Sequence, residues 1–112
     1  MGKKAKVAFV RTTPETIIED YARLMDLADY KKTLKPDATT ILKNNISWHM
    51  LYPSANTTPW QIEGVVEKLK SDNYNDLVVV ENRTVVTKAQ KGEKLNNFTP
   101  VHEKYNLPIK YN

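Results

Sequence analysis

Four consecutive apolar residues, Leu77 to Val80, are the feature that most narrows what this chain can fold into. A run without polar alternation is typical of a strand covered on both faces, as strands are in a parallel sheet. Parallel strands need crossover connections, usually helices, and 112 residues provide the length for one such domain. The run therefore predicts a single α/β domain over residues 1–112.

Three Thr-Pro pairs predict where the helices begin, because a hydroxyl suits the N-cap and proline suits the first helical position. The pairs are Thr13-Pro14, Thr58-Pro59 and Thr99-Pro100. Apolar residues follow the first two pairs at three- and four-residue spacing, which places them on one helical face, while the third helix is more weakly patterned. Gly64 lies inside the second predicted helix, where it indicates close packing against a neighbouring element.

Strands are predicted at residues 6–10, 39–43, 77–80 and 107–111, so that strands and helices alternate along the chain. This order predicts an α/β fold, a βαβαβαβ unit in two or three layers. Right-handed crossovers would give a mostly parallel four-stranded sheet. Pro108 places the last strand at an edge, because proline cannot donate to a ladder.

Composition excludes several kinds of site and partner. The chain has no cysteine, which excludes disulfides, zinc–thiolate sites and iron–sulfur ligation within it. No spacing of His, Asp and Glu predicts a metal site, and the only glycines, Gly2, Gly64 and Gly92, form no phosphate-binding loop. The apolar run at 7–10 is too short for a signal peptide or membrane span, so we expect a cytoplasmic protein without membrane insertion. A net charge of +4, mostly from scattered lysines, does not favour nucleic-acid binding.

Two connections are unusually long, at residues 44–57 and 81–98, where about 2–6 residues are normal. Both follow the carboxyl ends of predicted strands, where ligands of α/β sheets gather. We therefore expect a small-molecule or anionic ligand at these two loops. No particular cofactor is indicated.

The first loop and its borders supply eight candidate residues. They are Lys43, Asn45, Ser47, Trp48, His49, Thr57, Thr58 and Trp60. The tryptophans could wall a pocket, with Lys43 and the helix N-terminus at Thr58 giving positive potential for an anion. Alternatively, the aromatic side chains form a small core that pins the loop. His49 is a candidate general base, whereas His102, in the weak third helix, is expected at the surface.

The second loop begins with Glu81, Asn82 and Arg83, directly after the apolar strand. A carboxylate in this place suits acid/base chemistry or ribose or cation binding. Alternatively, Glu81 forms an ion pair with Arg83 or Lys43 that joins the two loops. Taken together, Lys43, His49 and Glu81 are the catalytic candidates, and Asn82 and Arg83 join the ligand-binding candidates of the first loop.

Four segments resemble the uncharacterised prokaryotic family catalogued as domain of unknown function three-six-two. They are residues 7–12 (VAFVRT), 43–49 (KNNISWH), 56–61 (NTTPWQ) and 80–84 (VENRT). The family pattern has a strand ending in Lys-Pro-Asn, then a Thr-Thr-His-Pro helix start, then a strand ending near Glu. Here Asn44 replaces the proline and the histidine before Pro59 is absent.

The resemblance covers about residues 6–111, which correspond to the N-terminal third of a typical member. It implies that the longer members continue with more α/β structure, some with ferredoxin-like cysteine motifs that this chain lacks. The family has no settled activity. The resulting hypothesis is a ligand-binding α/β domain of an enzyme or redox protein. The alternative is a truncated, non-catalytic homologue, or an interaction module that self-associates or docks on a partner chain through an open sheet edge.

Overall fold

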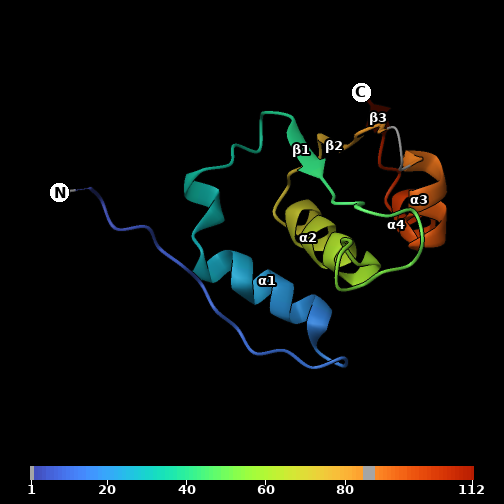
Figure 1. The fold of residues 1–112 in the computed structure, drawn as a ribbon. Coiled ribbons are helices and arrows are strands. Elements are labelled where there is room, and N and C mark those ends of the chain that lie inside the picture. Colours follow the sequence, from blue (N-terminus) through green and yellow to red (C-terminus); the bar gives the residue numbers. More distant parts are fainter. Residues whose placement is uncertain (1, 85–87) are drawn as a thin grey trace.

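The computed structural model describes residues 2–84 and 88–112 and confirms the α/β class. In chain order the elements are α1 (Ile17–Leu27), η1 (Tyr30–Lys32), β1 (Thr40–Lys43), α2 (Pro59–Ser71), β2 (Leu77–Glu81), α3 (Ala89–Leu95), α4 (Phe98–Lys104) and β3 (Ile109–Tyr111). The strands form a parallel sheet in the order β1-β2-β3 (Figure 1). The apolar run at 77–80 is therefore the central strand, and the segment after Pro108 is an edge strand as predicted.

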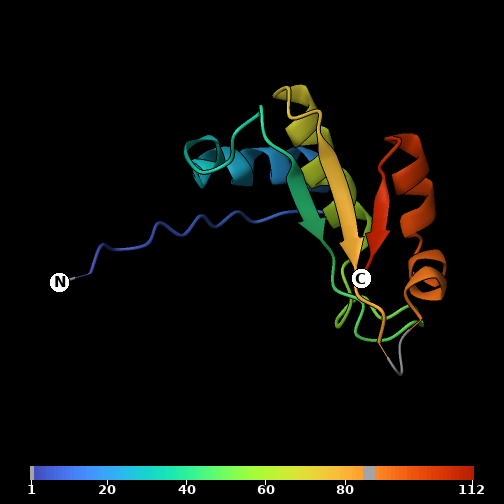
Figure 2. The same ribbon diagram turned by 90° about the horizontal axis from the view of Figure 1, so that it is seen from above.

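All helices lie on one face of the sheet, so the domain has two layers (Figures 1 and 2). Leu42, Val79 and Ile109 pair across the three strands and contribute to the core between sheet and helices. From the helices, Ile62, Val66 and Phe98 are buried in the same cluster. Among the described residues, no helix has the length and apolarity needed to cross a membrane.

The predicted strand at residues 6–10 is not formed, so three strands are described where the sequence predicted four. This segment runs beside α1, on the side away from the sheet (Figure 1). Lys6 forms an ion pair with Asp29, while Val7 and Phe9 are 87 % and 82 % exposed. The physical reason is that strand propensity reflects packing and pairing, and none of the described strands pairs with this segment.

Of the three Thr-Pro pairs, one begins a helix as predicted and two do not. Thr58 is the N-cap of α2 and its N–H donates to Gln61 Oε1 at 2.8 Å, so this prediction is confirmed. By contrast, α1 begins three residues after Pro14, and the Thr99-Pro100 pair lies inside α4. The second predicted loop also contains a helix, α3, which the sequence pattern did not predict. Residues 85–87 of this loop lie outside the described residues.

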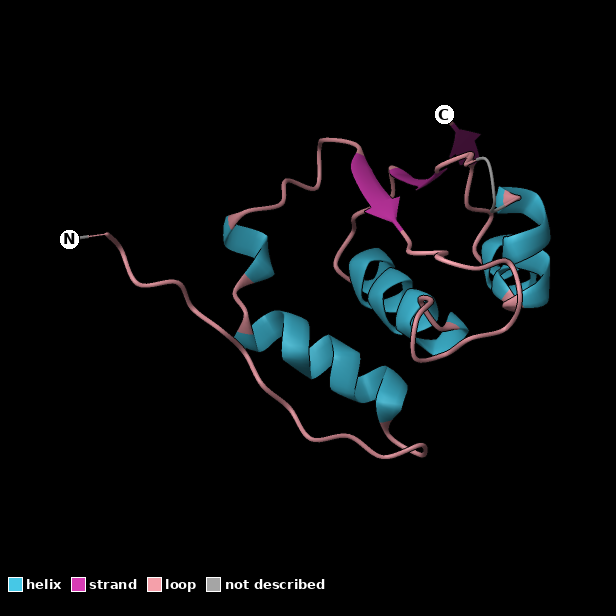
Figure 3. Ribbon diagram, viewed as in Figure 1, coloured by secondary structure: helices cyan, strands magenta, loops and turns pink. Residues whose placement is uncertain are grey.

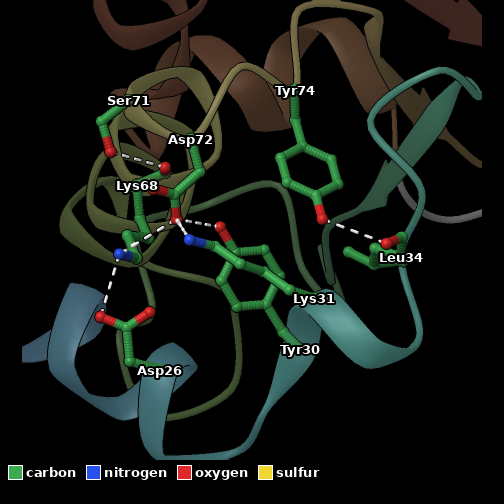
Figure 4. Close-up of polar contacts among 8 residues, drawn as sticks. All are labelled: Asp26, Tyr30, Lys31, Leu34, Lys68, Ser71, Asp72 and Tyr74. Carbon is green, nitrogen blue, oxygen red and sulfur yellow. Dashed lines mark hydrogen bonds and ion pairs between the residues drawn. The ribbon is translucent and has the colours of Figure 1, made fainter.

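A polar cluster fixes the end of α1 and the turn after it to the end of α2 (Figure 4). The carboxylate of Asp72 accepts a hydrogen bond from Tyr30 and ion pairs from Lys68 at 3.0 Å and Lys31 at 3.2 Å. The Tyr30 hydroxyl, followed by the two ammonium groups, lowers the pKa of Asp72 to about 2. Lys68 on α2 also forms an ion pair with Asp26 on α1. Ion pairs therefore join α2 to α1, a helix that has no fully buried residue.

We expect Gly64→Ala to lower the free energy of unfolding by about 1–2 kcal/mol. A Cβ at this position would lie 2.8 Å from Tyr21 Cβ on α1, and overpacking of this kind costs about 1–3 kcal/mol. The better helix propensity of alanine offsets up to about 1 kcal/mol of that cost. Urea unfolding measures the difference, and a net gain in stability would show that α1 does not approach α2 this closely.

Candidate functional site

The three parallel strands end on the same side of the sheet, and the two long loops therefore meet there (Figure 2). We call this side, where the strands end, the carboxyl edge; it is distinct from the lateral edges formed by β1 and β3. Lys43 ends β1, Glu81 ends β2 and Tyr111 ends β3. In the register, Lys43 pairs with Val80 and Glu81 pairs with Tyr111. The sequence therefore located the edge correctly, and the structure adds Tyr111 to it.

Glu81 is the most strongly perturbed group at this edge. It is 1 % exposed, and its Oε1 has no hydrogen-bond partner. The pKa of Glu81 is raised to about 7, chiefly by burial and to a smaller extent by Glu93, against the lowering effects of Lys43 and Asn44. No ion pair within 4.0 Å joins Glu81 to Lys43 or Arg83 in the described chain, so the ion-pair interpretation of Glu81 is wrong. A carboxyl group with this pKa can take up or give a proton near neutral pH.

Glu93 on α3 is a second buried carboxyl group, which the sequence pattern did not indicate. Tyr111 Oη donates to Glu93 Oε2 at 3.0 Å, while Glu93 Oε1 has no partner. Burial raises the pKa of Glu93, and burial together with this hydrogen bond raises the pKa of Tyr111 to about 12. No local motif connects Glu93 with Tyr111, because the helix and the strand meet only in the fold.

His102 lies behind this pair, and the prediction of a surface position for it is wrong. It is buried on α4, with its ring centroid 6.1 Å from that of Phe98. Its Nδ1 lies 4.0 Å from Glu93 Oε2, and neither ring nitrogen has a hydrogen-bond partner. Burial lowers the pKa of His102, which favours the neutral imidazole. The weak apolar pattern of α4 concealed that this histidine faces the core.

A cleft of about 320 Å³ lies beside β1, between the strand and helices α1 and α2. Its apolar wall consists of Tyr21, Ile41, Leu42, Ile62 and Val65. Its polar end consists of Lys43, Asn44, Thr57 and Gln61, at the carboxyl end of β1 and the N-terminus of α2. Asn44 Nδ2 is buried without a hydrogen-bond partner. Lys43 and Asn44 therefore border the cleft and also act on the charge of Glu81.

Three of the predicted ligand-binding residues form hydrogen bonds within the first loop. Asn45 Nδ2 donates to Ser47 Oγ at 3.0 Å and to Ala55 O at 2.6 Å. The N–H of Asn45 donates to Thr57 Oγ1 at 2.8 Å. Since Thr57 also lines the cleft, it is the one of these three that borders the candidate site.

Asn56 and Asn96 fix this loop to α3, and sequence reasoning missed both. Asn56 Oδ1 accepts the N–H groups of Ser47 at 2.8 Å and Trp48 at 3.2 Å. Its Nδ2 donates to Trp48 O, Met50 O and, at 3.0 Å, Asn96 Oδ1. Figure 3 shows the loop running from β1 towards α3 and back to α2. These buried amides set the shape of the loop.

The aromatic candidates do not line the cleft. The Trp48 ring stacks on His49 with centroids 5.2 Å apart, and both tryptophans are 43 % exposed. Trp60 and Thr58 instead border a smaller pocket of about 120 Å³ with Leu51. His49 Nδ1 is buried without a hydrogen-bond partner, and no described hydrogen bond or ion pair joins His49 to Lys43 or Glu81.

The remaining two candidates are at the end of β2. Arg83 lies over the Tyr111 ring, 5.6 Å from its centroid, and Asn82 is exposed. Arg83 is thus close to Tyr111, whose place is set by the pairing of β3 with β2 and by the hydrogen bond to Glu93. Among residues 2–84 and 88–112, no group of three or more His, Asp and Glu side chains is placed to hold a metal ion.

Of the predicted catalytic residues, Lys43 borders the polar end of the cleft together with Asn44. Glu81 is buried at the end of the neighbouring strand and does not line the cleft, but Lys43 and Asn44 both act on its pKa. His49 does not line the cleft either. Such an arrangement can bind an anionic group and exchange a proton with it. The family resemblance stays a prediction. No protein-family model, curated protein or solved structure matches the chain.

Proposed function

We propose that the protein is an α/β ligand-binding domain of an enzyme or redox protein, and that it takes a small molecule with a carboxylate or phosphate group at the polar end of the cleft. One observation carries this proposal. Glu81, buried with a free carboxyl oxygen, ends the central strand within the electrostatic influence of Lys43, whose ammonium group donates to Asn44 O. Strongly perturbed groups beside a cleft are candidates for function, because such burial costs stability.

Each residue at the polar end has a distinct role in this proposal. Lys43 supplies the positive charge, and the buried amide of Asn44, which also acts on Glu81, supplies a hydrogen-bond donor at the cleft. The N-terminus of α2 adds its partial positive charge. Glu81 takes up a proton when the anion binds, because a nearby negative charge disfavours the ionised form of its carboxyl group.

The affinity for an anion is therefore expected to fall as the pH rises above about 7. Below this pH the neutral form of Glu81 predominates, and the affinity for the anion no longer changes with pH. Above it, each pH unit weakens binding by up to about tenfold, since binding must first protonate Glu81. Calorimetric titration with inorganic phosphate and with pyruvate, in two buffers of different ionisation enthalpy, measures both the affinity and the proton uptake.

Two pairs of variants make the measurement specific. Glu81→Gln is expected to keep the affinity of the protonated form and to lose both the pH dependence and the proton uptake. Lys43→Met is expected to weaken binding about tenfold, whereas Lys35→Met removes an exposed charge elsewhere and leaves binding unchanged. Equal losses in the two lysine variants, or no binding of either anion by the folded protein, would contradict the proposal.

A further inference from the structure

Both outer strands of the described sheet, β1 and β3, have an unpaired side, and the side of β1 has an apolar cleft next to it. β1 pairs with β2 on one side, and no described strand pairs with its other side. Ile41 on this strand is 63 % exposed. An unpaired edge of this kind presents a row of backbone donors and acceptors that can receive another strand.

The cleft beside this edge has an apolar part, which a small anion bound at the polar end would leave unoccupied. Tyr21 from α1, Ile41 and Leu42 from β1, and Ile62 and Val65 from α2 line it. In a strand added along β1, alternate side chains would point toward the helix layer, which is where this apolar wall lies. The edge therefore offers both backbone pairing and a place for apolar side chains.

A segment with matching properties lies near the N-terminus, against α1 and outside the sheet. Residues 6–10 (KVAFV) are rich in strand-forming side chains, and Val7 and Phe9 are almost fully exposed. We call residues 6–10 the arm. The arm lies across α1 from its own sheet and leads away from it (Figures 1 and 2). Extended chain from residue 6 to residue 16 reaches about 36 Å, enough to meet a neighbouring molecule.

We propose that two copies of the chain exchange arms, each arm adding a strand to the open β1 edge of the other copy. Phe9 and Val7 would fill the apolar length of the cleft, or Ala8 and Val10 in the other strand register. The exchange buries the same surface twice around a two-fold axis. It requires release of the exposed ion pair between Lys6 and Asp29, which contributes little to stability, and of the contact of half-buried Val10 with α1. The polar end of the cleft stays free for the ligand.

Sedimentation equilibrium of the whole chain tests the exchange. The wild type is expected to be a dimer, and Phe9→Asp is expected to shift it to a monomer with an unchanged circular dichroism spectrum, because the Phe9 side chain is exposed within one copy. Lys43→Met, at the polar end, is expected to remain a dimer, so failure of arm exchange and failure of the anion site are distinguishable. A wild type that stays monomeric at high concentration overturns the exchange.

Cross-linking identifies the partner surfaces, because the chain has no cysteine of its own. An oxidised mixture of Ala8→Cys chains and Ile41→Cys chains is expected to give a disulfide-linked heterodimer, because Ala8 and Ile41 both face away from the helices when Val7 and Phe9 fill the cleft. A mixture of Ala8→Cys with Lys110→Cys, on the opposite edge strand, serves as the control and is expected to give little. Equal cross-linking in both mixtures overturns the proposal, as does a monomeric cross-link within the Ala8→Cys/Ile41→Cys double variant.

Discussion

Glu81→Gln is expected to raise the free energy of unfolding by about 3 kcal/mol at pH 8 and to leave it nearly unchanged at pH 4. The ordinary pKa of the glutamate side chain is 4.5, and burial raises the pKa of Glu81 to about 7 in the folded protein. Each unit of difference corresponds to about 1.36 kcal/mol, so ionised Glu81 destabilises the fold by about 3 kcal/mol. Glutamine has the same shape without this cost.

The sign follows from the direction of the pKa change. Because folding raises the pKa, the folded state binds the proton more tightly than the unfolded state does. Below about pH 4.5 both states are protonated and Glu81 has no ionic cost. The cost develops between pH 4.5 and 7 and is complete above it, so wild-type stability falls with rising pH over that window.

Urea unfolding of wild type and Glu81→Gln at several pH values measures this difference. Glu103→Gln is the matched control, because Glu103 is exposed on α4 and the same change there should give parallel curves. A loss of stability in Glu81→Gln at pH 8 would mean that the carboxylate is held by a strong ionic partner. That result would also remove the observation on which the anion site rests.

Sequence periodicity found the elements that depend on local signals. The apolar run at 77–80 became the central strand β2, and Thr58-Pro59 began α2. Gly64 was correctly expected at a close helix contact. Glu81 and Lys43 were placed at the same sheet edge because strand ends in a parallel sheet share one side. These features follow from a single segment and the rule that governs parallel sheets.

Features that depend on contacts between distant segments were beyond sequence reasoning. Residues 6–10 have the composition of a strand but pair with nothing in the sheet, because pairing is decided by the rest of the fold. Glu93 meets Tyr111 only because α3 packs below the end of β3. Asn56 and Asn96 are forty residues apart and have no motif in common. Sequence reasoning therefore placed the ends of the strands together, whereas it did not indicate the buried groups beside them.

Asn56→Ala is expected to lower the free energy of unfolding by about 3 kcal/mol and the melting temperature by roughly 10 °C. The substitution removes the acceptor of the Ser47 and Trp48 N–H groups and the donor to Asn96 Oδ1, while Asn96 Nδ2 keeps its hydrogen bond to Gly92 O. Each unsatisfied buried group costs about 1–3 kcal/mol, and partial access of water to the loop reduces the sum. Thermal unfolding followed by circular dichroism measures the loss, and Trp48 fluorescence reports the loop itself.

Asn75→Ala is the matched control, since Asn75 is exposed and its amide donates only one long hydrogen bond, at 3.5 Å to Asn73 O. It should change the stability by less than about 0.5 kcal/mol. The Asn56→Ala/Asn96→Ala double variant separates the shared bond from the rest. Because each single variant already breaks the bond between the two amides, the double variant should cost less than the sum of the singles. Strictly additive losses would show that the loop and α3 are stabilised independently, and that this pair of amides does not hold the loop at the edge of the sheet.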